Sequence, residues 1–157
     1  MPSEAEQIQT LGLMAAHESA LADLYRAYAK KLPSYEDFFN DLAADEVLHA
    51  RMVAGLAEDV KAGKVQVRAG RFSVESILSS LDFAKARVAE AERGEVSLVE
   101  ALSTAKNVEG GLIERRYFEI FEDDGPELME LLQRLAAETE GHRARVAAAW
   151  ERERGES

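Results

Sequence analysis

Four long stretches of this chain place apolar residues at alternating three- and four-residue steps, the spacing that gathers side chains on one face of an α-helix. The four stripes are Leu11, Met14, Leu21, Tyr25, Tyr28 and Leu32; Phe39, Leu42, Val53, Leu56 and Val60; Leu98, Leu102, Ala105, Leu112, Ile113, Tyr117 and Ile120; and Leu128, Leu132, Leu135, Val146 and Trp150. Only the short Val65-Gln66-Val67 has the alternation of a strand. The pattern predicts an all-α protein.

Each stripe is interrupted near its middle by polar residues. They are Glu18 in the first stripe, Glu46 and His49 in the second, Glu109 in the third, and Thr139 and His142 in the fourth. A carboxylate buried without an opposite charge costs several kcal/mol, so a helix that turns both a Glu and a His inward needs a compensating partner. A metal ion is the usual one. Four stripes that each supply such residues indicate one shared site.

The stop signals divide the chain into four long helices and one accessory helix. We expect helices over Ser3–Lys31, Tyr35–Ala62, Ser73–Gly94, Ser97–Glu122 and Pro126–Arg152, with a turn at Leu32-Pro33-Ser34 and an extended linker over Gly63–Phe72. Ser34 is the expected N-cap of the second helix, and Ser97 begins a capping box. The plan is two antiparallel pairs joined by one long crossover that carries the accessory helix, in a single domain over residues 1–157.

The composition limits the chemistry. With no cysteine the chain has no disulfide, thiolate nucleophile or iron–sulfur ligands, so redox chemistry must use a nitrogen- and oxygen-bound metal or a borrowed cofactor. A net charge of −11 argues against nucleic acid and anionic membranes as partners, although plain solubility also accounts for it. The N-terminus lacks the features of a signal peptide and no apolar run is long enough to span a membrane, so we expect a soluble cytoplasmic protein.

The two helix pairs resemble each other. The segment Leu42–His49 aligns with Leu135–His142, so that Glu46 corresponds to Thr139 and His49 to His142. Glu18 and His49 lie 31 residues apart, and Glu109 and His142 lie 33 apart. An internal duplication is the simplest account.

On these residues, essentially the whole chain resembles the rubrerythrin-like branch of the ferritin-like superfamily, whose four-helix bundles carry a Glu and then a Glu-x-x-His, twice over. The resemblance implies a ferritin-like antiparallel bundle that holds two iron ions, sometimes manganese, which react with dioxygen or hydrogen peroxide, as in a peroxidase or ferroxidase. The positions that match family ligands are Glu18, Glu46, His49, Glu109 and His142. We expect iron as the cofactor, as two ions or one, with manganese or zinc as alternatives, and a homodimer.

Two departures from the family pattern affect the proposed site. Thr139 stands where the second Glu-x-x-His has its Glu, and Glu138, four residues before His142, is the best replacement although it points about 100° away around the helix. Two divalent ions then face three carboxylates. Either a bridging hydroxide balances the charge, or a single ion binds with a protonated histidine. Because the chain lacks cysteine, it also lacks a rubredoxin-like domain, and an external protein must donate electrons.

Other interpretations remain open at the level of sequence. One alternative is a metal-binding or iron-storage protein without catalytic turnover. Another is a non-catalytic bundle whose metal site is partly degraded. Without a metal, Glu109 could pair with Arg116, and the two histidines could be hydrogen-bonded core residues. We expect Tyr25 and Tyr117 to be core aromatics rather than redox participants, and we expect His17, which is off the stripe, to lie on the flank of its helix.

Overall fold

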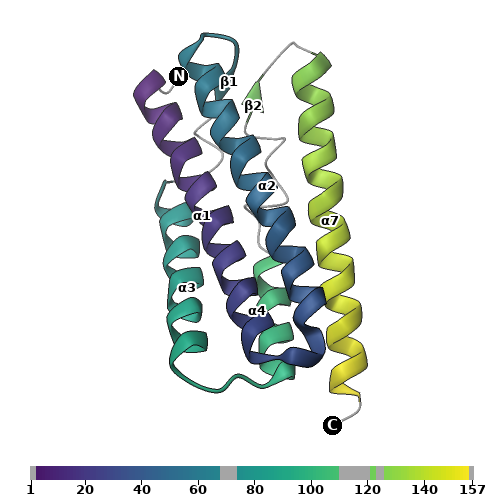
Figure 1. Ribbon diagram of the computed structural model, residues 1–157. Coiled ribbons are helices and arrows are strands. Elements are labelled where there is room, and N and C mark those ends of the chain that lie inside the picture. Colours follow the sequence, from purple (N-terminus) through teal and green to yellow (C-terminus); the bar gives the residue numbers. More distant parts are fainter. Residues whose placement is uncertain (1–2, 68–73, 110–120, 123–125, 156–157) are drawn as a thin grey trace.

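The computed structural model describes residues 3–67, 74–109, 121–122 and 126–155. Within these ranges the chain is almost entirely helical, so the all-α prediction is confirmed (Figure 1). The elements are α1 (Glu4–Lys31), a 3₁₀ turn η1 (Pro33–Tyr35), α2 (Glu36–Lys61), β1 (Gln66–Val67), α3 (Val74–Arg93), α4 (Leu98–Glu109), β2 (Phe121–Glu122) and α7 (Pro126–Arg154). No helix among the described residues is both long and apolar enough to cross a membrane.

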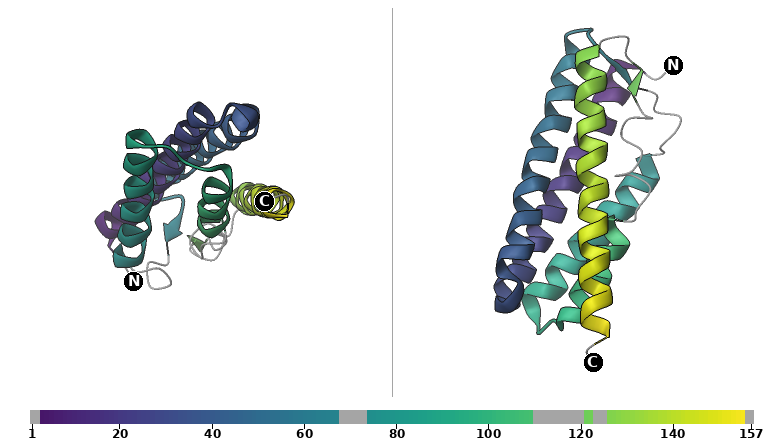
Figure 2. Two further views of the ribbon diagram at one scale, coloured as in Figure 1. Left: turned by 90° about the horizontal axis from the view of Figure 1, so that it is seen from below. Right: turned by 90° about the vertical axis from the view of Figure 1, so that its right-hand side faces the viewer.

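Helices α1 and α2 form an antiparallel hairpin (Figures 1 and 2). Ser3 begins α1 as its N-cap, because its side chain accepts a hydrogen bond of 3.1 Å from the backbone N–H of Glu6. The expectation that Ser34 caps α2 is wrong. Pro33–Tyr35 instead form a 3₁₀ turn whose Tyr35 N–H bonds to the Leu32 carbonyl, and α2 begins one residue later than predicted, at Glu36.

The accessory helix is present as α3, which packs along α1. It buries the predicted face, namely Ile77, Leu81, Ala84 and Ala91, with Val88 partly buried. Ser97 caps α4 as expected, because its hydroxyl oxygen accepts the N–H of Glu100 at 3.1 Å. The capping signal at Ser97 therefore located the start of α4, whereas Ser73, the residue expected to begin the accessory helix, lies outside the described residues.

The predicted extent of the helix that begins after Ser97 is wrong at its far end. Phe121–Glu122 belong to β2 and pair antiparallel with β1, in the register Gln66 with Glu122 and Val67 with Phe121. The pairing satisfies backbone hydrogen-bonding groups of two segments that are far apart in sequence. The helical spacing of apolar residues does not predict such a long-range interaction. The predicted stripe members Leu112, Ile113, Tyr117 and Ile120 lie outside the described residues.

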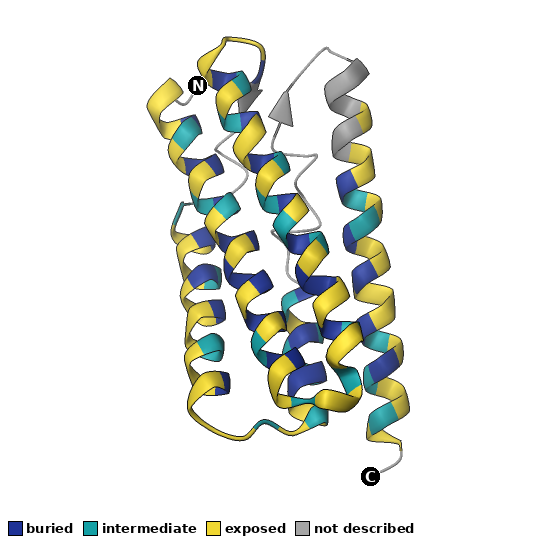
Figure 3. Cartoon of the chain, in the orientation of Figure 1, coloured by how far each residue is buried: buried dark blue, intermediate teal, exposed yellow. Residues whose placement is uncertain are grey.

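The core consists of two apolar clusters stacked along the helix axes. One contains Leu21, Leu24, Tyr25, Phe39, Leu42, Leu102, Ala105 and Val146, and the other contains Leu11, Met14, Val53, Leu56, Val60, Ile77 and Leu135. Figure 3 shows the buried residues following the inner faces of the helices. The polar positions on α1, α2 and α7 fall between the two clusters in each helix, so the fold brings them to one level of the core.

Candidate metal centre

All six polar residues predicted to interrupt the stripes are buried. Exposed fractions are 0% for Glu18, Glu46 and Glu109, 1% for His49 and Thr139, and 3% for His142. They come from α1, α2, α4 and α7, each of which turns its apolar face inward. The inward orientation of these positions, predicted from spacing alone, is confirmed, whereas their role as metal ligands stays a prediction.

The carboxylate of Glu46 lies between the two histidines. Its Oε1 is 3.2 Å from Nδ1 of His142, and its Oε2 is 3.5 Å from Nδ1 of His49. The two imidazole rings stack with centroids 5.5 Å apart and an interplanar angle of 26°. One donor atom from each of these three residues falls within 4.8 Å of the others, which is compact enough for a single ion to reach all three.

Glu18 and Glu109 extend this cluster, because both side chains lie close enough to that of Glu46 to influence its pKa. Glu109 Oε1 also lies 3.8 Å from Nδ1 of His142, and it accepts a hydrogen bond of 2.6 Å from the hydroxyl of Tyr25. The Oε2 atoms of Glu46 and Glu109 are buried and have no hydrogen-bond partner among the described residues. Three fully buried carboxyl groups therefore share one small region.

Burial raises the pKa of Glu46 well above its ordinary value of 4.5, and the nearby charges of Glu109 and Asp45 raise it further, while the hydrogen bond to Glu18 opposes them. Without a cation, the cluster lowers its energy by keeping a proton on Glu46. No Lys or Arg is among the buried residues of the described chain. A bound cation would reverse this preference, because it stabilises the ionised carboxylate.

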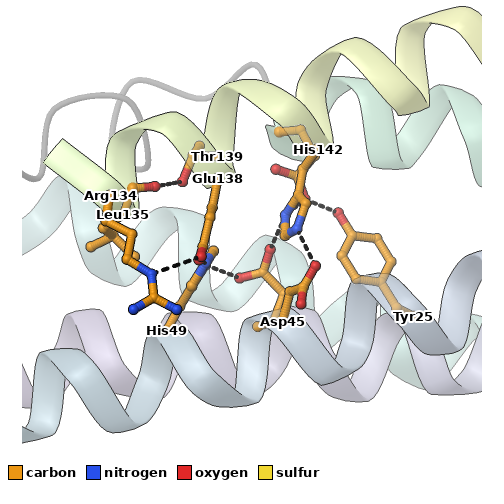
Figure 4. A network of polar contacts seen from close by, with 10 residues as sticks. Tyr25, Asp45, His49, Arg134, Leu135, Glu138, Thr139 and His142 are labelled. Atoms are coloured by element: carbon orange, nitrogen blue, oxygen red, sulfur yellow. Dashed lines mark hydrogen bonds and ion pairs between the residues drawn. The ribbon is translucent and has the colours of Figure 1, made fainter. Parts of the chain in front are cut away.

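A second carboxylate contacts the outer nitrogen of each histidine. Nε2 of His142 lies 2.8 Å from Asp45 Oδ2, and Nε2 of His49 lies 2.9 Å from Glu138 Oε2 (Figure 4). The other oxygen of Glu138 accepts a bond of 3.3 Å from Arg134. Asp45 and Glu138 occupy corresponding positions in the repeated segment, so each half of the repeat orients the histidine of the other. Protonated at Nε2, both rings present the Nδ1 lone pair to Glu46.

The structure places Glu138 on the outer side of the His49 ring and not beside Glu46. Its side chain is 37% exposed, and its role as a replacement ligand for the residue lost at Thr139 stays a prediction. The hydroxyl of Thr139 donates to the backbone carbonyl of Leu135, four residues earlier, at 3.0 Å. Thr139 is therefore buried at the level of the carboxylates while its hydrogen atom points back along α7.

Sequence reasoning missed two contributors to the site. Asp45 directly precedes Glu46 and aligns with Glu138, and that correspondence is the signal that could have found it. Tyr25 is fully buried as expected for a core aromatic, but the bond of its hydroxyl to Glu109 was not anticipated. His17 lies on the flank of α1, as expected, but this flank is buried. His17 is 2% exposed and its Nε2 lies 2.8 Å from the Ser80 hydroxyl, because α3 covers that side of α1.

Arg116, the alternative partner expected for Glu109, lies outside the described residues. In comparisons with known proteins, no protein-family model, no curated protein and no solved structure matched this chain.

Proposed function

We propose that the buried cluster is a transition-metal centre. The observation that supports it is the convergence of three fully buried carboxyl groups on two histidines that turn Nδ1 toward them, with no buried Lys or Arg among the described residues. Hydrogen-bonded core histidines alone leave the cost of three carboxylates unexplained. Imidazole and carboxylate together suit iron, manganese and zinc.

In this proposal two ions share the carboxylate of Glu46. Glu18, Glu46 Oε2 and His49 would hold one ion, while Glu109, Glu46 Oε1 and His142 would hold the other. The distances of 3.2 and 3.5 Å between donor atoms of Glu46 and the histidines are close to the roughly 3 Å expected for neighbouring ligands at about 2.1 Å from one ion. With Thr139 in place of a fourth carboxylate, a hydroxide or a single-ion state would balance the charge.

We further propose that α1, α2, α4 and α7 form a ferritin-like four-helix bundle, with α3 on the long crossover, and that the protein is a rubrerythrin-like oxidoreductase. The antiparallel α1–α2 hairpin and the packing of α4 on α7 support this assignment. Bound ferrous ions would supply electrons to dioxygen or hydrogen peroxide. An external donor would return them, because the chain has no cysteine with which to bind a second redox centre of the iron–sulfur type.

The residues of the chain have separate tasks in this proposal. The carboxylates bind the ions and neutralise their charge, and Asp45 and Glu138 keep the histidines in the tautomer that leaves Nδ1 free to bind. The apolar clusters on either side exclude bulk water, which strengthens these electrostatic interactions. Tyr25 donates a hydrogen bond from its phenolic hydroxyl to Glu109, at the edge of the centre.

Elemental analysis of protein reconstituted with ferrous iron tests the proposal. We expect about one to two transition-metal ions per chain, and loss of most of that metal in Glu46→Ala and His49→Ala with unchanged helical circular dichroism. Glu140→Ala is the matched control, because Glu140 pairs with Arg143 on the exposed side of α7. If the metal content is unchanged in both Glu46→Ala and His49→Ala, the metal site lies elsewhere. In stopped flow, ferrous protein that neither oxidant oxidises would contradict the oxidoreductase assignment.

A further inference from the structure

Aromatic rings connect the carboxylate cluster to the end of the molecule where α1 turns into α2. The ring of Phe39 lies 6.2 Å from that of Tyr25 and 6.3 Å from that of Tyr35, between centroids. Phe38 and Tyr28 contact the same ring at 5.2 and 5.3 Å. Tyr25, which bonds to Glu109, is thus separated from the η1 turn by one intervening ring.

Tyr25 and Tyr35, at the two ends of this series of aromatic rings, differ in exposure, but each donates its phenolic hydrogen to a carboxylate. Tyr25 is fully buried and donates to a carboxylate at 2.6 Å. Tyr35 is partly exposed and donates to Glu153 Oε1 at 2.5 Å, and Arg152 donates to its phenol oxygen at 2.8 Å. Tyr35 also lines a surface hollow of about 410 Å³ together with Ser34 and Arg152. Each end of the aromatic series therefore has a phenol with a proton acceptor in place.

Tyr28 provides the contrast. Its ring is close to Phe39, but the side chain in hydrogen-bonding contact with its hydroxyl is that of Thr104 and not a carboxylate. A phenol gives up an electron readily when its proton passes at the same time to a nearby base, and the required contact is about 2.6–3.2 Å. Tyr25 and Tyr35 meet this condition, whereas no carboxylate among the described residues is hydrogen-bonded to Tyr28.

We propose that Tyr35, Phe39 and Tyr25 form an electron path to the metal centre, and that the surface around Tyr35 accepts electrons from a one-electron donor such as a reduced flavin or iron–sulfur protein. This inference rests on the proposed function, which requires an external donor. It replaces the expectation that Tyr25 is only a core aromatic.

The transfer balances in three steps. Tyr25 passes an electron to the oxidised centre and its phenolic proton to Glu109. Tyr35 then passes an electron to the Tyr25 radical through Phe39, while its own proton moves to Glu153 and Glu109 returns the first proton to Tyr25. The external donor finally reduces the Tyr35 radical, and Glu153 returns the proton. One electron has moved from the donor to the centre, and every proton is back on its phenol.

The lack of cysteine makes a direct test practicable. Ser34→Cys supplies a single thiol in the exposed η1 turn, to which a ruthenium polypyridine photo-oxidant can be attached. The labelled protein is loaded with ferrous iron under anaerobic conditions. A light flash followed by oxidative quenching of the label generates an oxidant at the η1 end of the molecule. The absorbance of ferric iron then measures iron oxidation, and no catalytic turnover is needed. We expect Tyr25→Phe and Tyr35→Phe to slow iron oxidation roughly tenfold or more, and Tyr28→Phe to change it less than about twofold.

Equal rates of iron oxidation in the labelled parent protein and in its Tyr25→Phe, Tyr35→Phe and Tyr28→Phe variants would overturn the path. A label at the other end of α2, in Lys64→Cys, is expected to oxidise the iron at a rate that Tyr35→Phe does not alter. If elemental analysis finds no bound iron, the proposed function fails, and the path is then tested in the metal-free labelled protein by electron paramagnetic resonance. The path predicts tyrosyl radicals at two sites in the wild-type sequence and at one in Tyr25→Phe. A radical confined to Tyr35 in both would refute it.

Discussion

The carboxyl group of Glu46 couples the stability of this site to pH. Because burial and neighbouring carboxylates raise the pKa of Glu46 in the folded protein, the folded state holds a proton that the unfolded chain releases above about its ordinary value of 4.5. The contribution of Glu46 to the free energy of unfolding therefore falls as pH rises above 4.5. Metal binding must displace this proton, so metal affinity rises with pH.

We therefore expect Glu46→Gln, which keeps the side chain's size and removes its charge, to stabilise the metal-free protein relative to the wild-type sequence as pH increases. The measurement is denaturant unfolding in the presence of a chelator at several pH values between 5 and 8. Glu140→Gln, on the exposed side of α7, serves as the control. If wild type and Glu46→Gln have the same pH dependence, Glu46 does not carry the proton.

His17 gives the opposite sign. Burial lowers its pKa from 6.5 to about 4, so the neutral ring is favoured in the folded state. Its contribution is fully present above pH 6.5 and is lost as pH falls toward 4. We expect His17→Gln, which can still bond to Ser80, to reduce the loss of unfolding free energy between pH 7 and 4.5 by about 2 kcal/mol. Identical losses in both proteins, measured by denaturant unfolding, would contradict this prediction.

Helical spacing predicted the burial of every stripe residue at the site because orientation on a helix depends on local sequence alone. The same logic could not assign Asp45 or Tyr25, whose roles depend on which atom of a neighbouring helix each side chain meets. Nor could it assign His17, since only the docking of α3 against α1 decides that the flank of α1 is covered. Residue-level prediction succeeded where one helix decides the outcome and failed where two helices do.

At the scale of elements, α2 and α7 hold each other's histidines through Asp45 and Glu138. Both carboxylates are partly exposed, at 42% and 37%, so their value lies less in stability than in fixing the ring orientation. Carboxylates that bond to the outer nitrogen of a metal-binding histidine typically contribute roughly 10–100-fold to metal affinity. The crossed arrangement requires that the two helices keep their register.

We therefore expect Asp45→Ala and Glu138→Ala each to weaken metal binding by roughly tenfold or more, with little change in helical content. Isothermal titration with manganese measures the affinity, and nitrogen NMR of the histidine rings reports the tautomer. Asp41→Ala is the control, because Asp41 is an exposed residue on α2 one turn before Asp45. A structural role alone would alter unfolding but leave the tautomer populations as they are.

Element boundaries were predictable where capping chemistry is local, as at Ser3 and Ser97. They were not predictable where backbone bonds join distant segments. The pairing of β1 with β2 connects residues more than fifty positions apart, and Val65-Gln66-Val67 offered only a weak indication of it. The η1 turn similarly replaced an expected cap, because Pro33 favours a tight turn whose hydrogen bond is closed by the backbone.

On the scale of the whole molecule, the segments Leu42–His49 and Leu135–His142 agree at the histidines and carry an acidic residue at the same outer position, but they differ at the centre of the site. Glu46 supplies a buried carboxylate from α2, and its counterpart on α7 is Thr139, whose hydroxyl bonds to its own helix. The outer pairs, Asp45 with His142 and Glu138 with His49, are preserved on both sides. The asymmetry is therefore confined to one ligand position, which makes a restoration experiment informative.

Thr139→Glu adds the fourth carboxylate three residues before His142, as Glu46 stands before His49. We expect it to raise occupancy of the second ion and the rate of ferrous oxidation, and to destabilise the metal-free protein, since it buries another charge at a cost of roughly several kcal/mol. Thr139→Gln separates size from charge, and Ala137→Glu places a carboxylate on an exposed position of the same helix. A loss of stability in Thr139→Glu without any gain in metal would mean that the core has closed around Thr139, and the two-ion proposal would give way to a one-ion site.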